Sequence, residues 1–296
     1  MTLAMSHAPG KTSGSMTGTG ARLNLHRYAA WAIIALIVVV QVYPLLWILL
    51  TALRPAQEFA AGDAFALPSS LTLDNFVRAF AQGNLGRFLF NSIIVTVAAD
   101  ALIVLLGMMA AYAIQVIGFK WSRVVLGLFL IGIIVPAHVT LVPLFLNYRN
   151  LGLLNSYWSI IVPLVGFSLP MSVYLFQSFY SYISRELYDA ATIDGAGPYR
   201  IFLLITAPMS VNTVVTVVFV NTIFIWNDFI FANTFVLDKN MKTVPLGLQS
   251  YMGAMGSIDW TATFAAVCVT VTPLLLALLV LNRAIIYGIQ GGATKG

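Results

Sequence analysis

The stretch Glu186-Leu-Tyr-Asp-Ala-Ala-Thr-Ile-Asp-Gly-Ala196 is a charged segment between two long runs that carry no charge, Asn150–Ser184 and Ile201–Asn227. Each flanking run exceeds the ~20 apolar residues that a membrane-spanning helix requires. A chain that places such a segment between two spans exposes it to water on one side of the membrane. The stretch therefore indicates both a membrane protein and a structured loop.

The residues of this stretch predict a short helix that ends in a sharp turn. Ala190 and Ala191 are strong helix formers with little bulk, and Arg185 and Asp189 are spaced to pair along one helical turn. The sequence Gly195-Ala-Gly-Pro198 then stops this helix and starts another, with its second glycine as N-cap and its proline in the first turn. Small side chains here would let another protein approach the backbone closely, although an ordinary solvated loop has a similar composition.

The composition predicts an all-α polytopic membrane protein. Of 296 residues, 60% are apolar and only 8% are charged, whereas soluble domains carry about 25% charged residues. Mean hydropathy is +0.91. We expect six transmembrane helices, at about 28–52, 90–117, 123–146, 156–181, 203–231 and 261–287.

The two ends of the chain differ from this region. Residues 1–27 begin with a segment rich in Gly, Ser and Thr, which predicts a disordered N-terminal segment. Residues 28–290 form the expected six-helix transmembrane domain, with the loop at 184–204, and residues 291–296 form a tail. The lone Cys268 is interpreted as a small core residue.

The distribution of charge predicts the orientation. Six spans place both termini on one side, which carries nine Lys and Arg residues against six on the other. The positive-inside rule therefore favours cytoplasmic termini. The only acids on that side are Glu186, Asp189 and Asp194, all in the opening stretch. The sequence pI of 9.4 fits a basic cytoplasmic face, and no basic patch with interleaved aromatic residues suggests nucleic-acid binding.

The loop resembles the signature E-L-x-E-A-A-x-I-D-G-A of carbohydrate importer permeases driven by ATP-binding cassette subunits. Residues Glu186–Ala196 follow it except at Asp189, which keeps the negative charge on a shorter side chain. Ile205-Thr-Ala-Pro208 stands near the second half of the motif. Further segments that resemble the maltose-permease (MalG-like) type are Leu71–Phe76, Phe90–Ser92, Thr243–Gln249 and Gly291–Gly296.

This resemblance implies a MetI-like fold of the type I importers in a bacterial inner membrane. It implies three kinds of protein partner besides membrane lipid: a second homologous permease, two ATPase subunits and an extracytoplasmic solute-binding protein. The implied ATPase-docking residues are Glu186, Asp189, Ala190, Ala191, Asp194 and Gly195. The chain has no G-x-x-x-x-G-K-[ST] phosphate loop, so ATP and Mg would bind to the partner subunits. We expect no enzymatic activity, cofactor or metal on this chain.

Two sets of residues are candidates for contact with solute or with the binding protein. Asp100 lies within a span, where a carboxylate costs about 2.5–3.5 kcal/mol, so it is either functional or hydrogen-bonded to a neighbouring helix. Trp226, Asn227 and Asp228 close the fifth span with groups that suit a sugar, although an aromatic belt also explains the indole. The resemblance assigns the loop at Tyr251, Met252 and Gly253 to the binding protein, and a plain flexible loop is the alternative.

We therefore expect the permease subunit of a binding-protein-dependent importer, for a sugar or oligosaccharide. One alternative is an importer permease for another solute such as glycerol phosphate. The other is an ion-coupled secondary transporter, which would require coupled acids within the spans. Asp100 is the only acid that qualifies, and the sequence offers it no evident partner.

Overall fold

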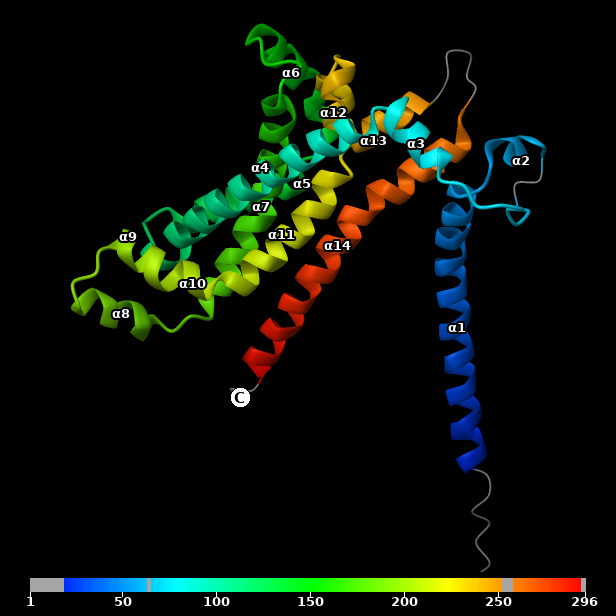
Figure 1. Ribbon diagram of the computed structural model, residues 1–296. Coiled ribbons are helices and arrows are strands. Elements are labelled where there is room, and N and C mark those ends of the chain that lie inside the picture. Colours follow the sequence, from blue (N-terminus) through cyan, green and yellow to red (C-terminus); the bar gives the residue numbers. More distant parts are fainter. Residues whose placement is uncertain (1–18, 63–64, 252–257, 294–296) are drawn as a thin grey trace, which may run out of the picture. The chain divides into compact units, whose positions relative to one another are not determined.

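The computed structural model describes residues 19–62, 65–251 and 258–293, and within these ranges it is helical (Figure 1). The longer helices are α1 (Thr19–Ala52), α3 (Asp74–Ala81), α4 (Leu85–Tyr112), α5 (Ser122–Ile134), α6 (Ala137–Asn150), α7 (Tyr157–Ser181), α8 (Arg185–Ile193), α11 (Val211–Trp226) and α14 (Trp260–Ala293). The shorter ones are α2 (Ala56–Ala60), α9 (Pro198–Ile201), α10 (Ala207–Met209), α12 (Ile230–Phe235) and α13 (Val244–Leu248), with 3-10 turns η3 (Lys239–Met241) and η4 (Gln249–Tyr251). Two π-helical segments, η1 (Ala113–Ile117) and η2 (Phe202–Thr206), complete the described elements.

The six expected spans correspond to four continuous helices and two bent pairs. The continuous spans are Ala30–Ala52, Leu85–Ile117, Tyr157–Ser181 and Trp260–Leu279. The third expected span is broken between α5 and α6 by 98°, and the fifth is broken between α10 and α11 by 70°. The all-α architecture is confirmed, and within the described residues each bent pair counts as one of the six expected spans.

Both breaks follow from proline chemistry. Val135 stands before Pro136 and takes an extended conformation (φ −69°, ψ 117°), because a proline ring disfavours the helical region for the residue before it. In the fifth span, Pro208 lacks an N–H and its ring crowds the preceding turn. The turn before it is the π-helical segment η2, and the chain bends after Met209. The second break lies close to the α8 helix, which gives it functional interest.

The chain divides into two units, residues 1–50 and residues 51–296. The described part of the first unit is α1, an apolar helix that contains Pro44. The helix begins at Thr19, so the prediction of disorder was wrong for residues 19–27. Leu23, Leu25 and the neighbouring arginines are good helix formers and explain the extension. Residues 1–18 lie outside the described part.

The core of the second unit lies between α4, α7 and α11, which pack side by side (Figure 1). On α4 the buried residues Val95, Ala99 and Ile103 recur every four positions, and on α7 Val173 and Phe176 face them. At Gly107 the two helices are in contact, since a Cβ there would lie 3.4 Å from the Phe176 ring. The α5 helix packs on the other side of α7, while α14 packs against α11 and α3.

The connections gather at the two ends of this bundle (Figure 1). One end, called the α8 end below, carries α8, α9 and α10 together with η1. The opposite end carries α3, α12 and α13. The opening stretch of the sequence analysis therefore lies at a single end, away from the α13 loop.

Candidate functional site

The α8 helix is defined by its own capping residues. At its start, the Ser184 side chain accepts a hydrogen bond from the Glu186 N–H at 3.3 Å. At its end, the N–H of Ala196 donates to the Ala191 carbonyl at 2.9 Å, and the N–H of Gly195 donates to the Thr192 carbonyl at 3.0 Å. This pair of bonds is the Schellman arrangement, in which the residue after the C-cap takes a left-handed conformation. Gly195 has φ +82°, which explains glycine at this position.

The two faces of α8 differ in exposure. Glu186, Asp189, Ala190 and Ile193 recur at helical spacing and are all exposed. On the opposite face, Tyr188 and Ala191 are partly buried against the core of the bundle. The structure thus brings Glu186, Asp189 and Ala190 onto one free surface, while Ala191 belongs to the supporting face.

The remaining predicted docking residues lie at the end of the helix. Asp194 is the C-cap, and Asp194 and Gly195 are both exposed. A Cβ added to Gly195 would meet no atom within 4 Å, so its surface is open. These two residues extend the outward face of α8 into the turn.

Sequence reasoning missed the apolar part of this surface. Ile193 is 86% exposed, and Tyr182 and Tyr199, which flank α8 on either side, are each 84% exposed. Apolar side chains exposed together with acids are typical of contact with a protein partner. The helical spacing of Ile193 from Glu186, seven residues, was the available signal.

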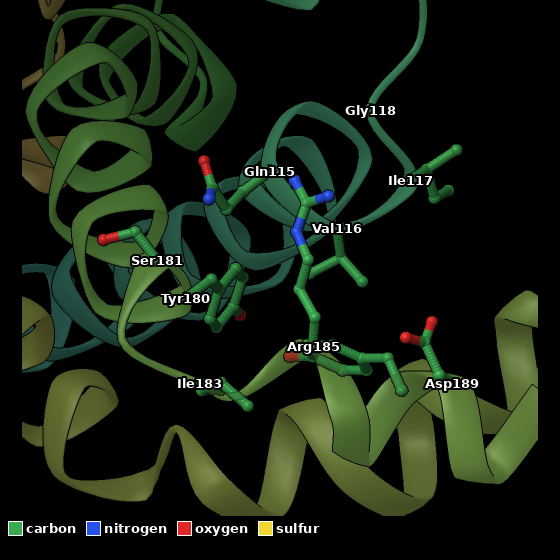
Figure 2. Close-up of a pocket in the computed structure, with 10 residues that line it drawn as sticks. Gln115, Val116, Ile117, Gly118, Tyr180, Ser181, Ile183, Arg185 and Asp189 are labelled. Carbon is green, nitrogen blue, oxygen red and sulfur yellow. The ribbon is translucent and has the colours of Figure 1, made fainter.

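The expected pair between Arg185 and Asp189 is not formed. The two ion pairs found among the described residues are Arg54–Glu58 and Arg78–Asp259, both far from α8 in sequence. Figure 2 shows the Arg185 guanidinium turned toward Gln115 and Val116, away from the Asp189 carboxylate. Asp189 therefore lies on the exposed face of α8 without this partner.

A pocket of about 240 Å³ lies behind α8, between the helix and the bundle (Figure 2). Its wall comes from η1, the end of α7 and α8 itself: Gln115, Val116, Ile117, Gly118, Tyr180, Ser181, Ile183, Arg185, Tyr188 and Asp189. The helix thus rests on few contacts and has space behind it. No cluster of three or more His, Cys, Asp or Glu side chains suited to a metal occurs within the described residues.

Asp100 is 8% exposed and links two spans. Its Oδ2 accepts a hydrogen bond of 2.7 Å from the Thr222 hydroxyl of α11. Its Oδ1 is buried and has no hydrogen-bond partner among the described residues, nor has the Thr96 hydroxyl one turn earlier. The structure supports the interpretation as a helix contact, because Thr222 is such a partner.

The three residues at the end of the fifth span are mostly engaged in structure. Trp226 is 7% exposed and packs with Phe88 and Val244. The Asp228 carboxylate accepts from the backbone N–H groups of Phe231 (3.4 Å) and Ala232 (3.2 Å), which begins α12. Burial raises the pKa of Asp228, and these backbone bonds oppose the shift. Asn227 is exposed, with its amide donating to the Ile223 carbonyl at 2.8 Å.

Tyr251 is a buried anchor, which revises its role as a contact residue. Its hydroxyl donates to the Ala79 carbonyl at 2.9 Å, and its ring lies where a Cβ on Gly83 would be, at 2.3 Å. Burial, and then the Asp259 charge, raise the pKa of Tyr251 to about 12. Met252 and Gly253 lie outside the described residues.

The segments around α13 explain two of the sequence motifs. The Asn91 amide donates to the carbonyls of Asn240 (2.9 Å) and Lys242 (2.8 Å), and the Ser92 hydroxyl accepts from the Val244 N–H at 2.8 Å. These bonds hold the segment before α14 against the start of α4. The motifs at Phe90–Ser92 and Thr243–Gln249 are therefore two sides of one structural contact.

The geometry defines a class of protein: a helical membrane protein with several apolar spans and a capped, exposed helix at one end of its bundle. The family model "Binding-protein-dependent transport system inner membrane component" matches residues 103–289. Those residues contain α8 and most of the bundle, and the chain belongs to this family. It is accordingly a transporter permease, a membrane subunit distinct from the ATPase, and family membership decides against the ion-coupled alternative.

Individual relatives agree over nearly the whole chain. The probable ABC transporter permease protein YurM of Bacillus subtilis is 33% identical over 90% of this chain and 88% of its own length. The diacetylchitobiose uptake system permease protein NgcG of Streptomyces coelicolor is 33% identical over 91% and 90%. The trehalose transport system permease protein SugB of Mycobacterium tuberculosis is 30% identical over 93% and 100%.

The fold is also found among solved structures. A bacterial ABC transporter involved in import of the acidic polysaccharide alginate has a chain that superposes with a TM-score of 0.71. The superposition covers 92% of this chain and 99% of that one, at 19% identity. This similarity supports the importer-permease fold expected from the sequence.

Proposed function

We propose that this chain is the permease subunit of an ATP-driven importer of sugars or oligosaccharides, and that α8 attaches it to an ATPase partner. The observation that carries the proposal is the outward face of α8, where Glu186 and Asp189 stand beside the exposed Ile193. Capping at both ends fixes this helix without burying it. A rigid exposed helix of this kind suits insertion into a groove of another protein.

The docking surface has three parts. Glu186, Asp189 and Asp194 supply negative charge that would select a basic rim. Ala190 and the open turn at Gly195 allow close backbone approach. Ile193 would fill an apolar pocket at the centre, while Ala191 supports the helix from behind and the tail at 291–296 could add further contacts. The last three residues of that tail lie outside the described part.

The other partners follow from the same assignment. A second homologous permease would complete the pathway, two ATPase subunits would bind ATP and Mg, and a solute-binding protein would deliver solute. With nine basic residues on the α8 side against six, both termini and α8 would face the cytoplasm. The loop that Tyr251 anchors would then face the binding protein on the opposite side of the membrane.

The solute class rests on relatives whose names specify sugars. NgcG is named for diacetylchitobiose, SugB for trehalose and AraQ of Halalkalibacterium halodurans for arabinooligosaccharides. Within this chain, Asn227 is the exposed member of the predicted substrate residues, so it is the strongest contact candidate. The test is the melting temperature of the binding protein encoded beside this chain. A rise with sugars supports the proposal, and a rise only with another solute such as glycerol phosphate contradicts it.

Docking is tested by co-purification of the ATPase with the tagged chain. Ile193→Asp places a charge in the apolar part of the surface, and Gly195→Trp adds bulk and backbone strain at the turn. Both should reduce the ATPase recovered by at least about tenfold, as expected for loss of a central interface residue. The matched control is Leu237→Asp, at a residue 68% exposed after α12 at the opposite end. Full recovery with both α8 variants would refute docking at α8.

A further inference from the structure

The inward face of α8 makes a contact that the docking surface does not use. Of the nine residues in α8, Tyr188 and Ala191 are the two that are partly buried. The Tyr188 hydroxyl lies 3.5 Å from the Thr206 hydroxyl, and Thr206 is completely buried at the end of η2. Burial raises the pKa of Tyr188. One side chain therefore connects the exposed helix to the fifth span.

Two more tyrosines from different helices contact the same part of the fifth span. Tyr112, the last residue of α4, donates its hydroxyl to the Pro198 carbonyl at 2.9 Å, and its ring packs on Phe202 with centroids 5.2 Å apart. The Tyr180 hydroxyl of α7 lies 3.4 Å from the hydroxyl of Ser210. Tyr112, Tyr180 and Tyr188 are together called the tyrosine cluster below. Along the fifth span, Tyr112 contacts its start at Pro198, Tyr188 contacts Thr206, and Tyr180 contacts the bend at Ser210.

The segments that this cluster contacts are those best able to change shape. Tyr112 directly precedes the π-helical η1, and Phe202 and Thr206 are the two ends of the π-helical η2. Ser210 lies between α10 and α11, at the 70° bend. Single π turns interrupt the regular hydrogen-bond ladder and occur mostly at functional positions.

Two cavities adjoin the tyrosine cluster. The pocket of about 240 Å³ behind α8 includes Tyr180 and Tyr188 in its wall. A second pocket, of about 350 Å³, is lined by Met109, Tyr112, Ala113, Ile117, Pro198, Tyr199 and Phe202. Protein interiors are normally close-packed and resist displacement, so cavities beside these contacts leave room for them to shift.

We propose that Tyr188 is a positioning residue that transmits displacement of α8 to the bend of the fifth span through Thr206. The inference rests on the proposed docking of α8. The two hydroxyls are farther apart here than the ~2.7–2.8 Å of a strong O–H···O hydrogen bond. When the ATPases close and push α8 toward the bundle, this contact shortens and favours the nucleotide-driven position of α11. A contact shifts such an equilibrium only by the difference in its strength between the two states.

The experiment measures the position of α11 in the complete transporter, purified with its ATPase subunits. Spin labels are placed at Phe224 on α11 and Val162 on α7, which are 71% and 51% exposed, after all native cysteines have been replaced by serine. Electron–electron resonance distances are recorded without nucleotide and with ATP trapped by vanadate. The variants are Tyr188→Phe, which removes only the hydroxyl, and Thr206→Val, which keeps the shape of its partner. The matched control is Tyr174→Phe on α7, a partly exposed tyrosine away from the cluster.

In the presence of trapped ATP, the labelled complex has a population at the nucleotide-driven distance and a population at the resting distance. We expect each variant to lower the ratio of the first population to the second by about 2- to 10-fold, the effect of one hydrogen bond. The double variant should lower it no further than either single variant, because both remove the same contact. Recovery of the ATPase and its nucleotide turnover should remain as in the parent. The proposal would be overturned by any of three results: population ratios that are unchanged in both single variants, a loss in the double variant that equals the sum of the single losses, or a label distance that nucleotide does not change. Loss of ATPase from the parent complex would instead refute docking itself.

Discussion

The turn after α8 allows a sharp test of how the docking helix is held. Gly195 and Gly197 are both exposed, and a Cβ added to either would meet no atom within 4 Å. They differ in backbone conformation, since Gly195 has φ +82° and Gly197 has φ −73°. Alanine adds the same methyl group at both positions, and that group contacts nothing at either one. A difference between the two alanine variants therefore reports the difference in backbone conformation.

The magnitude follows from the conformations. An alanine in the left-handed region costs about 1–2 kcal/mol. The lower entropy of the unfolded chain returns about 0.4–1 kcal/mol. Gly195→Ala should therefore destabilise the capped end of α8 by about 1 kcal/mol, which is roughly a fivefold loss of protection. At Gly197 the entropy gain is offset by a weaker N-cap, so alanine there should be nearly neutral.

The assay is hydrogen exchange of the backbone amides, read by mass spectrometry on a peptide that spans α8 and its turn. The informative amides are those of Gly195 and Ala196, which bond to the Thr192 and Ala191 carbonyls. Protection should fall about fivefold in Gly195→Ala, by less in Gly195→Asn because asparagine tolerates this conformation, and by under about twofold in Gly197→Ala. Equal exchange in the two alanine variants would refute the argument from backbone strain.

Three further perturbations test the rest of the bundle. Thr222→Val should destabilise the complex by about 1–3 kcal/mol and lower its melting temperature, because it leaves the buried Asp100 carboxylate unpaired. Asp100→Asn should not lower the melting temperature. The reverse order of the two variants would contradict the interpretation of Asp100 as a helix contact. Gly247→Ala should prevent stable assembly, since its Cβ would lie 2.1 Å from an aromatic ring carbon, while Gly166→Ala, in open space within α7, should be tolerated; similar yields of both would be inconsistent with this packing. The pKa of Tyr251 is raised to about 12, so the stability that its protonated hydroxyl adds to the folded state is complete below pH 10 and is lost as pH rises to 12. Thermal melts should show this loss of stability at alkaline pH in the parent and not in Tyr251→Phe.

The sequence predicted the spans well because each is a long apolar run, but hydropathy gives neither the place nor the size of a bend within a run. Pro136 and Pro208 stand within such runs, and hydropathy averages across them. The size of the resulting bends, 98° and 70°, depends on the helices that pack against each half. Composition alone contains no information on that packing.

The candidate sites show a similar limit. Side-chain type correctly placed Glu186 and Asp189 on an exposed helix face. Side-chain type also made Asp228 a substrate candidate, and the family resemblance made Tyr251 a contact for the binding protein. In the structure the Asp228 carboxylate accepts a backbone bond at the start of α12 and the Tyr251 hydroxyl anchors a loop, so both contact roles stay predictions. Polar groups at helix ends must satisfy backbone donors before they can serve a ligand. Which of these demands prevails depends on neighbours distant in sequence, such as Ala79.

The arrangement at the α8 end suggests why the fifth span is broken there. A continuous helix would pass a push from α8 along its axis without altering its direction. If α8 moves as proposed, a helix interrupted by η2 and bent at Ser210 would convert that displacement into rotation of α11 about the bend. Because α11 packs against α4, α7 and α14, this rotation reaches most of the bundle. In this proposal the acids and Ile193 on one face of α8 contact the ATPase, and Tyr188 on the other face contacts the fifth span.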